Sequence, residues 1–344
     1  VYQPSSGVVQ VGTDRGGQLD FDQSGLEGLT RRRVETDLDS WHWENLSFPA
    51  GVRMGQFRST RRTGVSAAGR FGPGGFEGRL NTGTFRNPAD AVIQTRSGTI
   101  FAAHLNPDGT FNVGQNDALP AGQYLSTAVL NDRQQRRQDL YRRLLDTGKK
   151  YSYLDHDRLF VWCEFDDLPF AVDGAERKVG TALLSVPIEY EPSGSGELTL
   201  PGGFVPYTAF SAGRSYPPRL NHTEPIRTRL RFQLPDCGRP FSVERATFQA
   251  RVRAPGRRFT VSGIAEGQSV QTFEQLNPAG SVRIEIAEPR FLRTDAEGGL
   301  FLEFAMSEMI GADGREKSLK SQETGLKWEI EAINLEVRGR LVGN

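Results

Sequence analysis

Two groups of acidic side chains are the residues in this sequence best suited to chemistry. Asp155 and Asp157 flank His156 in a polar stretch before the apolar run 158–165, and further acids close that run: Glu164, Asp166 and Asp167. Hard oxygen ligands in a loop suit Ca²⁺, but a polar turn capped by aspartate gives the same pattern. We expect no bound metal, and Asp155 and Asp157 are the residues closest to a metal site.

Paired carboxylates also hydrolyse glycosidic bonds when they lie roughly 5–10 Å apart. Such an enzyme needs a platform for the sugar, and Trp41 and Trp43 are the candidate ligand-binding residues. They share one face of an extended segment, with His42 on the other face. Two tryptophans on one face either stack on a sugar or pack in a core, and the simpler interpretation is core packing.

Catalytic signatures are absent from the sequence. It contains no CxxC, no HExxH, no GxSxG elbow and no phosphate-binding loop, and its four histidines lie in separate segments. Cys163 and Cys237 are either two buried thiols or one disulfide. We therefore expect no catalytic residue and no cofactor, and a non-catalytic role is favoured over an enzyme.

The composition favours a β-rich chain. It has 344 residues, 39 glycines and 19 prolines, a profile typical of many short strands joined by turns. The net charge is zero, so a nucleic-acid partner is not indicated. No apolar run reaches the ~18–20 residues that span a bilayer. We therefore expect any membrane anchor to lie outside these residues.

The first half of the chain predicts an extended N-terminal arm over residues 1–40 and a β-sandwich over residues 41–210, immunoglobulin-like in its turn spacing. Within it, the sequence NPDG at 106–109 predicts a tight turn, and Asn87-Pro88 predicts another. The run 183–188 is apolar at nearly every position, which predicts a central strand covered on both faces.

One strong helix is predicted over residues 129–147, inserted in this unit and capped by Asn131 or Asp132 at its start and by Gly148 at its end. Its apolar stripe comprises Leu140, Tyr141, Leu144 and Leu145. We expect that stripe to pack on a sheet and the arginine face to point outward. That face offers candidate interaction residues, namely Arg133, Arg136 and Arg137.

Residues 211–225 are rich in turn residues and predict a linker. Residues 226–344 then show eight short runs with period-two alternation, such as RTRLRFQL and INLEVRGRLV. Eight strands suit a second, jelly-roll-like β-sandwich. The predicted fold is therefore mainly β, with two sandwich units and one long α-helix between them.

Several segments carry a resemblance: FRNPADAVIQTRSG, DRQQRRQDLYRRLL, LFVWCEF, TALLSVPIEYEPSGSGELTLPGGFVPY and KWEIEAINLEVRGR. Together they resemble the extramembrane β-sandwich region of large bacterial membrane-anchored proteins of uncharacterised function. The resemblance implies a periplasmic or extracellular domain tethered by helices outside this chain, and it implies no activity.

Two functions follow from these observations. The first is a non-catalytic structural or protein-interaction module of the bacterial cell envelope, either the soluble part of a membrane-anchored protein or a subunit of an assembly, with protein partners. The alternative is a carbohydrate-binding or glycoside-hydrolysing β-sandwich protein.

Overall fold

The chain is mainly β, as predicted, with a single α-helix among the residues described. The computed structural model of the protein describes residues 7–13, 18–21, 32–35, 40–48, 55–58, 63–120, 122–126, 129–145, 155–165, 171–172, 180–194, 196–211, 214–216, 220–238, 240–310, 316–317 and 327–342. The expected helix cap Gly148, the acids Asp166 and Asp167 and most of the polar loop 307–325 lie outside these residues.

The chain forms two compact units, each made of separate stretches. Unit 1 comprises residues 1–65, 81–89 and 162–184, and unit 2 comprises residues 66–80, 90–161 and 185–344. The domain order expected from the sequence followed the chain in sequence order. Each of these units instead combines stretches that are distant in the sequence.

Unit 1 contains two small antiparallel sheets. One has the order β13-β1-β4-β3 and the other pairs β2 with β5. Their bounds are β1 (Gly7–Thr13), β2 (Gln18–Phe21), β3 (Arg32–Glu35), β4 (Trp41–Phe48), β5 (Gly55–Arg58) and β13 (Ala171–Val172). Strands β1 to β3 fall within the stretch expected to be an extended arm, and β1 pairs with β4 over most of its length.

An eight-stranded mixed sheet follows the order β10-β11-β7-β6-β14-β12-β8-β9. Its strands are β6 (Ser66–Gly72), β7 (Gly75–Asn81), β8 (Arg86–Gln94), β9 (Ile100–Ala102), β10 (His104–Leu105), β11 (Thr110–Val113), β12 (Arg158–Phe165) and β14 (Gly180–Tyr190). β14 and β6 pair in parallel. The turn expected at Asn87-Pro88 is wrong, because β8 runs through it, and residues 82–85 make the turn.

β14 carries the run that was expected to be covered on both faces. Its place between β6 and β12 makes it a central strand, as predicted. The double coverage is wrong, because Val186 and Ile188 are buried while Ser185 and Pro187 are exposed. The serine and proline in this run mark the solvent face of an ordinary alternating strand.

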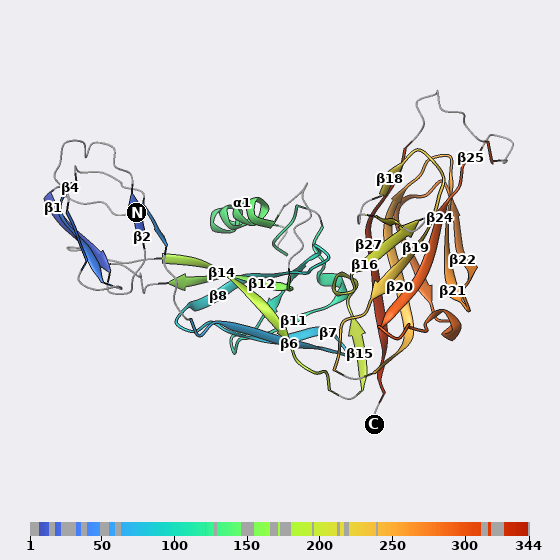
Figure 1. Ribbon diagram of the computed structural model, residues 1–344, viewed down its shortest axis with the longest axis horizontal. Coiled ribbons are helices and arrows are strands. Elements are labelled where there is room, and N and C mark those ends of the chain that lie inside the picture. The colour runs from blue at the N-terminus through green and yellow to red at the C-terminus, as the bar shows by residue number, and fades with distance from the viewer. Residues whose placement is uncertain are drawn as a thin grey trace. The chain divides into compact units, whose positions relative to one another are not determined.

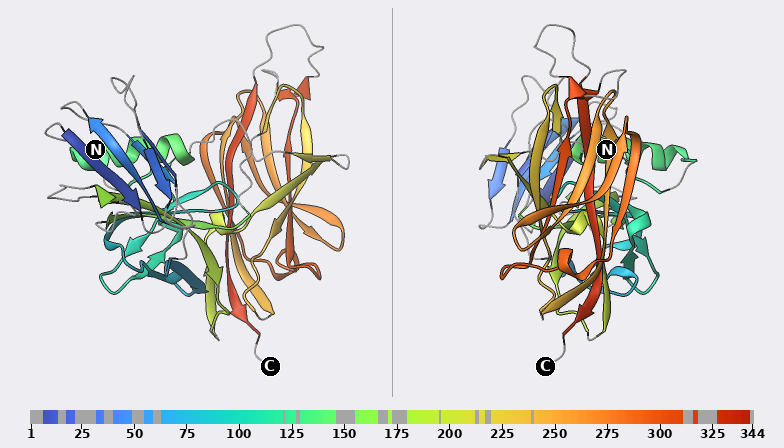
Figure 2. Two further views of the ribbon diagram at one scale, coloured as in Figure 1. Left: turned by 60° about the vertical axis from the view of Figure 1, so that its left-hand side comes forward. Right: turned by 90° about the vertical axis from the view of Figure 1, so that its right-hand side faces the viewer.

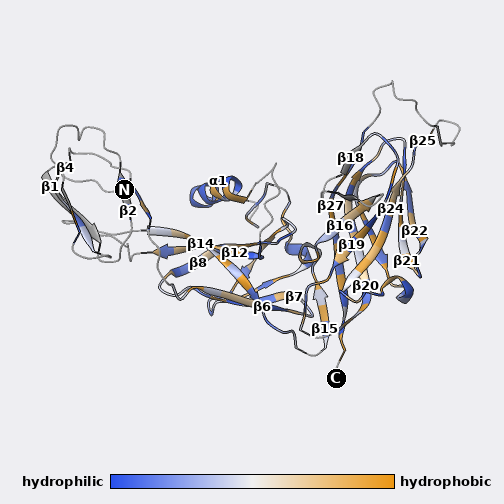
Figure 3. Cartoon of the chain, in the orientation of Figure 1, coloured by the Kyte–Doolittle hydropathy of each residue, from blue (hydrophilic) through white to orange (hydrophobic). Residues whose placement is uncertain are grey.

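The helix α1 (Asp132–Leu145) lies within the predicted range of residues 129–147, and it begins directly after Asn131, one of the two predicted caps. The side chain of Asn131 accepts a hydrogen bond from the backbone N–H of Gln134 at 2.9 Å, and the side chain of Gln134 accepts one from the N–H of Asn131 at 3.3 Å. This reciprocal pair satisfies two of the helix's unpaired N-terminal donors. Asn131 is therefore the cap. Figure 3 shows that most of the helix surface is hydrophilic.

The rest of unit 2 holds two larger antiparallel sheets, drawn in yellow to red in Figures 1 and 2. The first has the order β15-β27-β20-β23, with β18 also paired to β27, and the second has the order β17-β16-β19-β24-β21-β22. Their strands are β15 (Glu197–Leu200), β16 (Tyr207–Ser211), β17 (Arg214–Tyr216), β18 (Leu220–His222), β19 (Ile226–Gln233), β20 (Phe241–Arg253), β21 (Arg258–Ala265), β22 (Gln268–Leu276), β23 (Ala279–Ile286), β24 (Gly299–Met306) and β27 (Trp328–Leu341).

Smaller elements connect these strands. They are the 3-10 helices η1 (Gln115–Asp117), η2 (Gly202–Phe204) and η3 (Pro289–Phe291) and the two-stranded pair β25 (Met309–Ile310) and β26 (Glu316–Lys317). β17 and β18 lie inside the stretch expected to be a linker, and each pairs with a neighbouring strand.

A shared apolar core joins the two larger sheets. The strands alternate as the sequence predicts, so that Leu230 and Phe232 of β19 are fully buried. Phe232 meets Phe248 of β20 edge to face, with ring centroids 6.4 Å apart. The last of the eight runs, INLEVRGRLV, is part of a longer strand, β27, which continues past a bulge next to Ala332, whose φ is 52°.

No helix among the described residues is long and apolar enough to cross a membrane.

Candidate functional site

A hollow of about 510 Å³ lies on one face of strands β6, β7 and β11. Charged and amide side chains dominate its lining: Ala68, Arg70, Glu77, Gly78, Arg79, Asn106, Thr110, Phe111, Asn112 and Glu191. All of these residues belong to unit 2. We refer to it below as the polar hollow.

The register between β7 and β11 explains why this face is polar. Glu77 pairs with Asn112 and Arg79 pairs with Thr110, and all four side chains point to one face of the sheet. The intervening residues point to the other face, where Phe76 and Phe111 are buried. Gly78 sits opposite Phe111, and a Cβ at Gly78 would come within 2.5 Å of the Phe111 ring. The glycine therefore lets the ring lie under the floor of the hollow.

Hydrogen bonds hold the rim of the hollow in place. Arg70 donates to Glu77 at 3.0 Å, and the side-chain amide of Asn106 donates to the Thr110 hydroxyl at 3.0 Å. Arg70, Arg79, Glu77 and Glu191 contribute two positive and two negative charges, so the formal charge of the lining is zero.

The turn predicted at residues 106–109 is confirmed, and it supports one side of the polar hollow. The N–H of Gly109 donates to the carbonyl of Asn106 at 3.0 Å, and Gly109 has a φ of 83°. Asp108 accepts hydrogen bonds from the hydroxyl and the N–H of Thr110 at 2.7 and 3.0 Å. The Thr110 hydroxyl, followed by its N–H, holds the pKa of Asp108 below its ordinary value.

The acids singled out as the nearest candidates for a metal site have different surroundings. Asp155 is exposed, whereas Asp157 is only 3% exposed. One oxygen of Asp157 accepts the N–H of Arg96 at 2.5 Å and the other accepts the Tyr190 hydroxyl. Desolvation, reinforced by the Asp157 charge, raises the pKa of Tyr190 well above its usual range. Among the described residues no group of three or more His, Cys, Asp or Glu side chains could hold a metal ion.

The two tryptophans expected as ligand-binding candidates lie on β4. Trp41 is 4% exposed and Trp43 is partly buried. They pair with β1, Trp41 opposite Thr13 and Trp43 opposite Val11. Burial of Trp41 leaves little of its ring for a ligand to stack on.

The arginines of α1 are divided by the structure, and this corrects the expected face pattern. Arg133 and Arg136 are exposed, but Arg137 is only 7% exposed and forms an ion pair with Asp90. The expected apolar stripe is also wrong in half of its members, since Leu140 and Leu144 are 37% and 50% exposed. The helix packs through Arg137, Gln138, Tyr141 and Leu145 instead.

Polar contacts explain this orientation of α1. The Gln138 side chain accepts the N–H of Tyr124 at 3.0 Å and donates to the carbonyl of Gly122 at 3.0 Å. The Tyr141 hydroxyl donates to the carbonyl of Asp90 at 2.8 Å. Each bond satisfies a buried or partly buried group that would be costly to leave unpaired. The helix therefore docks by hydrogen bonding as much as by apolar burial.

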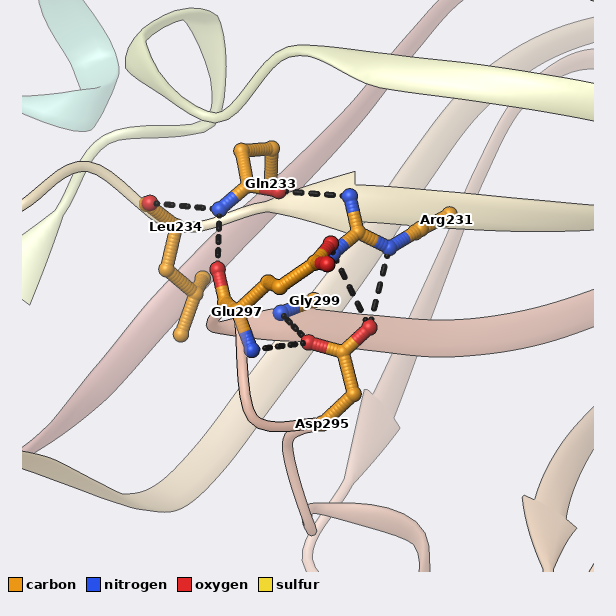
Figure 4. A network of polar contacts seen from close by, with 6 residues as sticks. All are labelled: Arg231, Gln233, Leu234, Asp295, Glu297 and Gly299. Atoms are coloured by element: carbon orange, nitrogen blue, oxygen red, sulfur yellow. Dashed lines mark hydrogen bonds and ion pairs between the residues drawn. The ribbon is translucent and has the colours of Figure 1, made fainter.

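A network around Arg231 connects β19 to the turn before β24 (Figure 4). Arg231 contacts Asp295 through Nε at 3.0 Å and Glu297 through a terminal nitrogen at 2.9 Å. Asp295 also accepts the N–H groups of Glu297 and Gly299 at 3.0 and 2.6 Å. Partial burial pushes the pKa of Asp295 upward, but the Gly299 N–H and Arg231 outweigh it and hold that pKa below its ordinary value.

We expect Asp295→Ala to lower the free energy of unfolding by about 1–3 kcal/mol at neutral pH, because it removes one of the two carboxylates that Arg231 contacts and leaves the N–H groups of Glu297 and Gly299 without their acceptor. A depressed folded-state pKa stabilises the protein above the unfolded value of about 3.9. That stabilisation is lost as the pH falls through the folded-state pKa. Urea melts at pH 7 and at pH 3 measure both effects.

The difference in free energy of unfolding between wild type and Asp295→Ala should therefore be smaller at pH 3 than at pH 7. Glu297→Ala is the control, because that side chain is 81% exposed and its loss should cost about 0.5 kcal/mol or less. An equal difference in free energy of unfolding at the two pH values would contradict the stabilising role assigned to the ionised Asp295 carboxylate.

Other buried polar groups have structural partners too. Glu336 is 3% exposed and accepts from Arg338 at 2.9 Å. Arg257 is 3% exposed and donates to the carbonyls of Ser307, at 2.8 Å, and Thr223. Cys163 and Cys237 are both buried thiols, and burial raises the pKa of the Cys237 thiol to about 11. A thiol with such a pKa is a poor nucleophile at neutral pH.

No protein-family model matches the chain, and comparison with curated proteins finds no significant match. Sequence reasoning missed the polar hollow. The signal was present in part, since FEGRLN and TFNV alternate charged or amide residues with apolar ones. The register that places the two segments side by side is a property of the folded sheet.

Proposed function

We propose that this chain is a non-catalytic interaction module of the bacterial cell envelope, built on a jelly-roll sandwich in its C-terminal half. The observation that carries the proposal is strand order. Eight strands in chain order are β15, β19, β20, β21, β22, β23, β24 and β27. Numbered one to eight in this chain order, the strands across the first sheet, β15-β27-β20-β23, are 1, 8, 3 and 6. Those across the second sheet, β19-β24-β21-β22, are 2, 7, 4 and 5. That arrangement matches the strand order expected of a jelly roll with two Greek keys, and this match supports the proposal.

Jelly rolls serve widely as binding and assembly domains, including lectins and capsid subunits. Fold alone does not assign a function, so the side chains must carry the rest. The immunoglobulin-like assignment of residues 41–210 does not enter the proposal, because β6 and β14 pair in parallel, whereas immunoglobulin sheets are antiparallel.

The hydrogen bonds that these acidic side chains accept support a non-catalytic role. Both oxygens of Asp157 and of Asp295 accept from donors of the fold, and one oxygen of Glu336 accepts from Arg338. A general acid or base must reach a substrate proton within hydrogen-bond distance. Groups committed to N–H, hydroxyl or guanidinium donors stabilise the fold instead.

Location in the envelope rests on the segments that resemble extramembrane regions of membrane-anchored proteins. Protein partners are part of the same proposal. Tethering to a membrane would come from segments outside the residues printed here.

Two measurements test the proposal. An epitope-tagged copy of the native protein, fractionated from its own bacterium, should appear in the envelope fraction, and recovery in the cytosol would refute that location.

The purified chain should release no nitrophenol from a panel of p-nitrophenyl glycosides above the buffer rate. Turnover that disappears in an Asp155→Asn or Glu164→Gln variant would make it a glycosidase and overturn the non-catalytic assignment.

A further inference from the structure

We propose that the polar hollow on β6, β7 and β11 is a binding site for a neutral saccharide. This rests on the non-catalytic binding role proposed above and gives that role a ligand class. The site differs from Trp41 and Trp43, the residues that the sequence pointed to for sugar binding.

The charge of the hollow selects against ionic ligands. Arg70 and Arg79 are balanced by Glu77 and Glu191, and all four lie in the lining. Arg70 and Glu77 are already paired at 3.0 Å. A site with no net charge offers no long-range attraction to phosphate, to a polyanion or to a basic segment.

The hydrogen-bonding groups match hydroxyls. Each sugar hydroxyl is at once a donor and an acceptor, so its binding site needs both kinds of group side by side. Asn106 and Asn112 supply amide donors and acceptors, Arg79 supplies donors, and Glu77 and Glu191 supply acceptors. Asn112 pairs across the strands with Glu77, which places an amide next to a carboxylate on the same face.

The lining of the hollow favours part of a sugar chain over an apolar small molecule. The apolar members of the lining are Ala68, Gly78 and Phe111, and the charged and amide side chains outnumber them, so a ligand rich in hydroxyls is favoured over an apolar drug-like one. Glu77, Arg79 and Asn112 stand on the paired strands β7 and β11, which fixes the spacing of their backbones. The surface is open and water-exposed, so each contact contributes little, and we expect a dissociation constant of about 0.1–10 mM.

The test is a titration of the isotope-labelled full chain with maltohexaose, cellohexaose and chitotetraose, followed by amide chemical shifts. Binding by at least one of the three should move the amide signals of residues 77–79 and 110–112. Asn112→Ala and Arg79→Ala should each weaken that binding at least fivefold. Gln271→Ala and Arg245→Ala remove an exposed amide and an exposed guanidinium from other strands and should leave it unchanged.

Three results would overturn the proposal: no shift with any of the three sugars, shifts that map away from the hollow, or equal affinity in the hollow variants and the controls. Tighter binding of heparin or of a charged peptide at the same amides would also overturn it, since the ligand would then not be neutral. Equal melting temperatures of all four variants show that each is folded. Absence of sugar binding together with envelope location and no glycoside turnover would refute this site and leave the proposed function standing.

Discussion

Replacing Arg137 with alanine is expected to lower the free energy of unfolding by about 3–5 kcal/mol. Arg137 is 7% exposed, and its partner Asp90 lies on β8. Removing the guanidinium leaves a carboxylate in a poorly solvated position without its counter-charge. Urea unfolding of wild type and variant, followed by far-UV circular dichroism, measures the loss.

Leu144→Ala is the informative comparison, because the apolar stripe expected from the sequence predicts that it lowers the free energy of unfolding more than Arg137→Ala does. Leu144 is 50% exposed, so its truncation should cost about 0.5 kcal/mol or less. Arg136→Ala, at an exposed position of the same helix, should be similarly mild. A larger loss for Leu144→Ala than for Arg137→Ala would show that the helix presents the opposite face to the protein.

A double-mutant cycle with Asp90→Ala isolates the ion pair itself. If Arg137 and Asp90 act on each other, the double variant should lose much less than the sum of the single losses. Strict additivity would assign the cost of Arg137→Ala to its other contacts.

The second large effect is expected at Phe204, where Phe204→Ala should cost about 3–5 kcal/mol. Phe204 of η2 is 3% exposed, and its ring lies 5.6 Å from Phe71, 5.0 Å from Phe76 and 5.1 Å from Phe101, measured between ring centroids. Its removal would open a cavity among three rings that stand on different strands and cannot close together easily.

The matched control for this cavity is Phe210→Ala, because Phe210 is 39% exposed on β16 and its loss should cost about 1 kcal/mol or less. The same urea melts compare the two variants, with equal m-values confirming that the unfolded states are alike. A small effect at Phe204 would mean that η2 is not part of the core.

The strands of the C-terminal half were predictable because their alternation is local. In RTRLRFQL each apolar residue points inward and each arginine or glutamine outward, and the burial of Leu230 and Phe232 follows that pattern. The helix start was predictable for the same reason, since Asn131 and its hydrogen-bond partner Gln134 are three residues apart.

The face of α1 could not be predicted, because its anchors are remote in sequence. Arg137 pairs with a residue 47 positions earlier, and Gln138 bonds to a loop 14 and 16 positions earlier. A pattern that ranks residues by apolarity selects Leu140 and Leu144 and rejects Arg137. Arg137 and Gln138 are buried because each has a polar partner in the folded protein.

The polar hollow lay beyond prediction for a related reason. Its residues come from three strands and two loops, and each strand alone reads as an ordinary solvated edge or half-buried segment. Only the pairing of Glu77 with Asn112 and of Arg79 with Thr110 brings them to one place.

The position of β27 in its sheet bears on how the protein is made in the cell. β27 lies between β15 and β20, and its register joins Glu197 to Arg340 and Phe241 to Leu341. During synthesis the strands before it emerge from the ribosome without their central neighbour. The sheet stays open, with unpaired edges on β15 and β20, until residue 341 has left the exit tunnel. Folding of this half is therefore completed late, and a nascent chain paused before β27 is the form most exposed to aggregation and most in need of a chaperone.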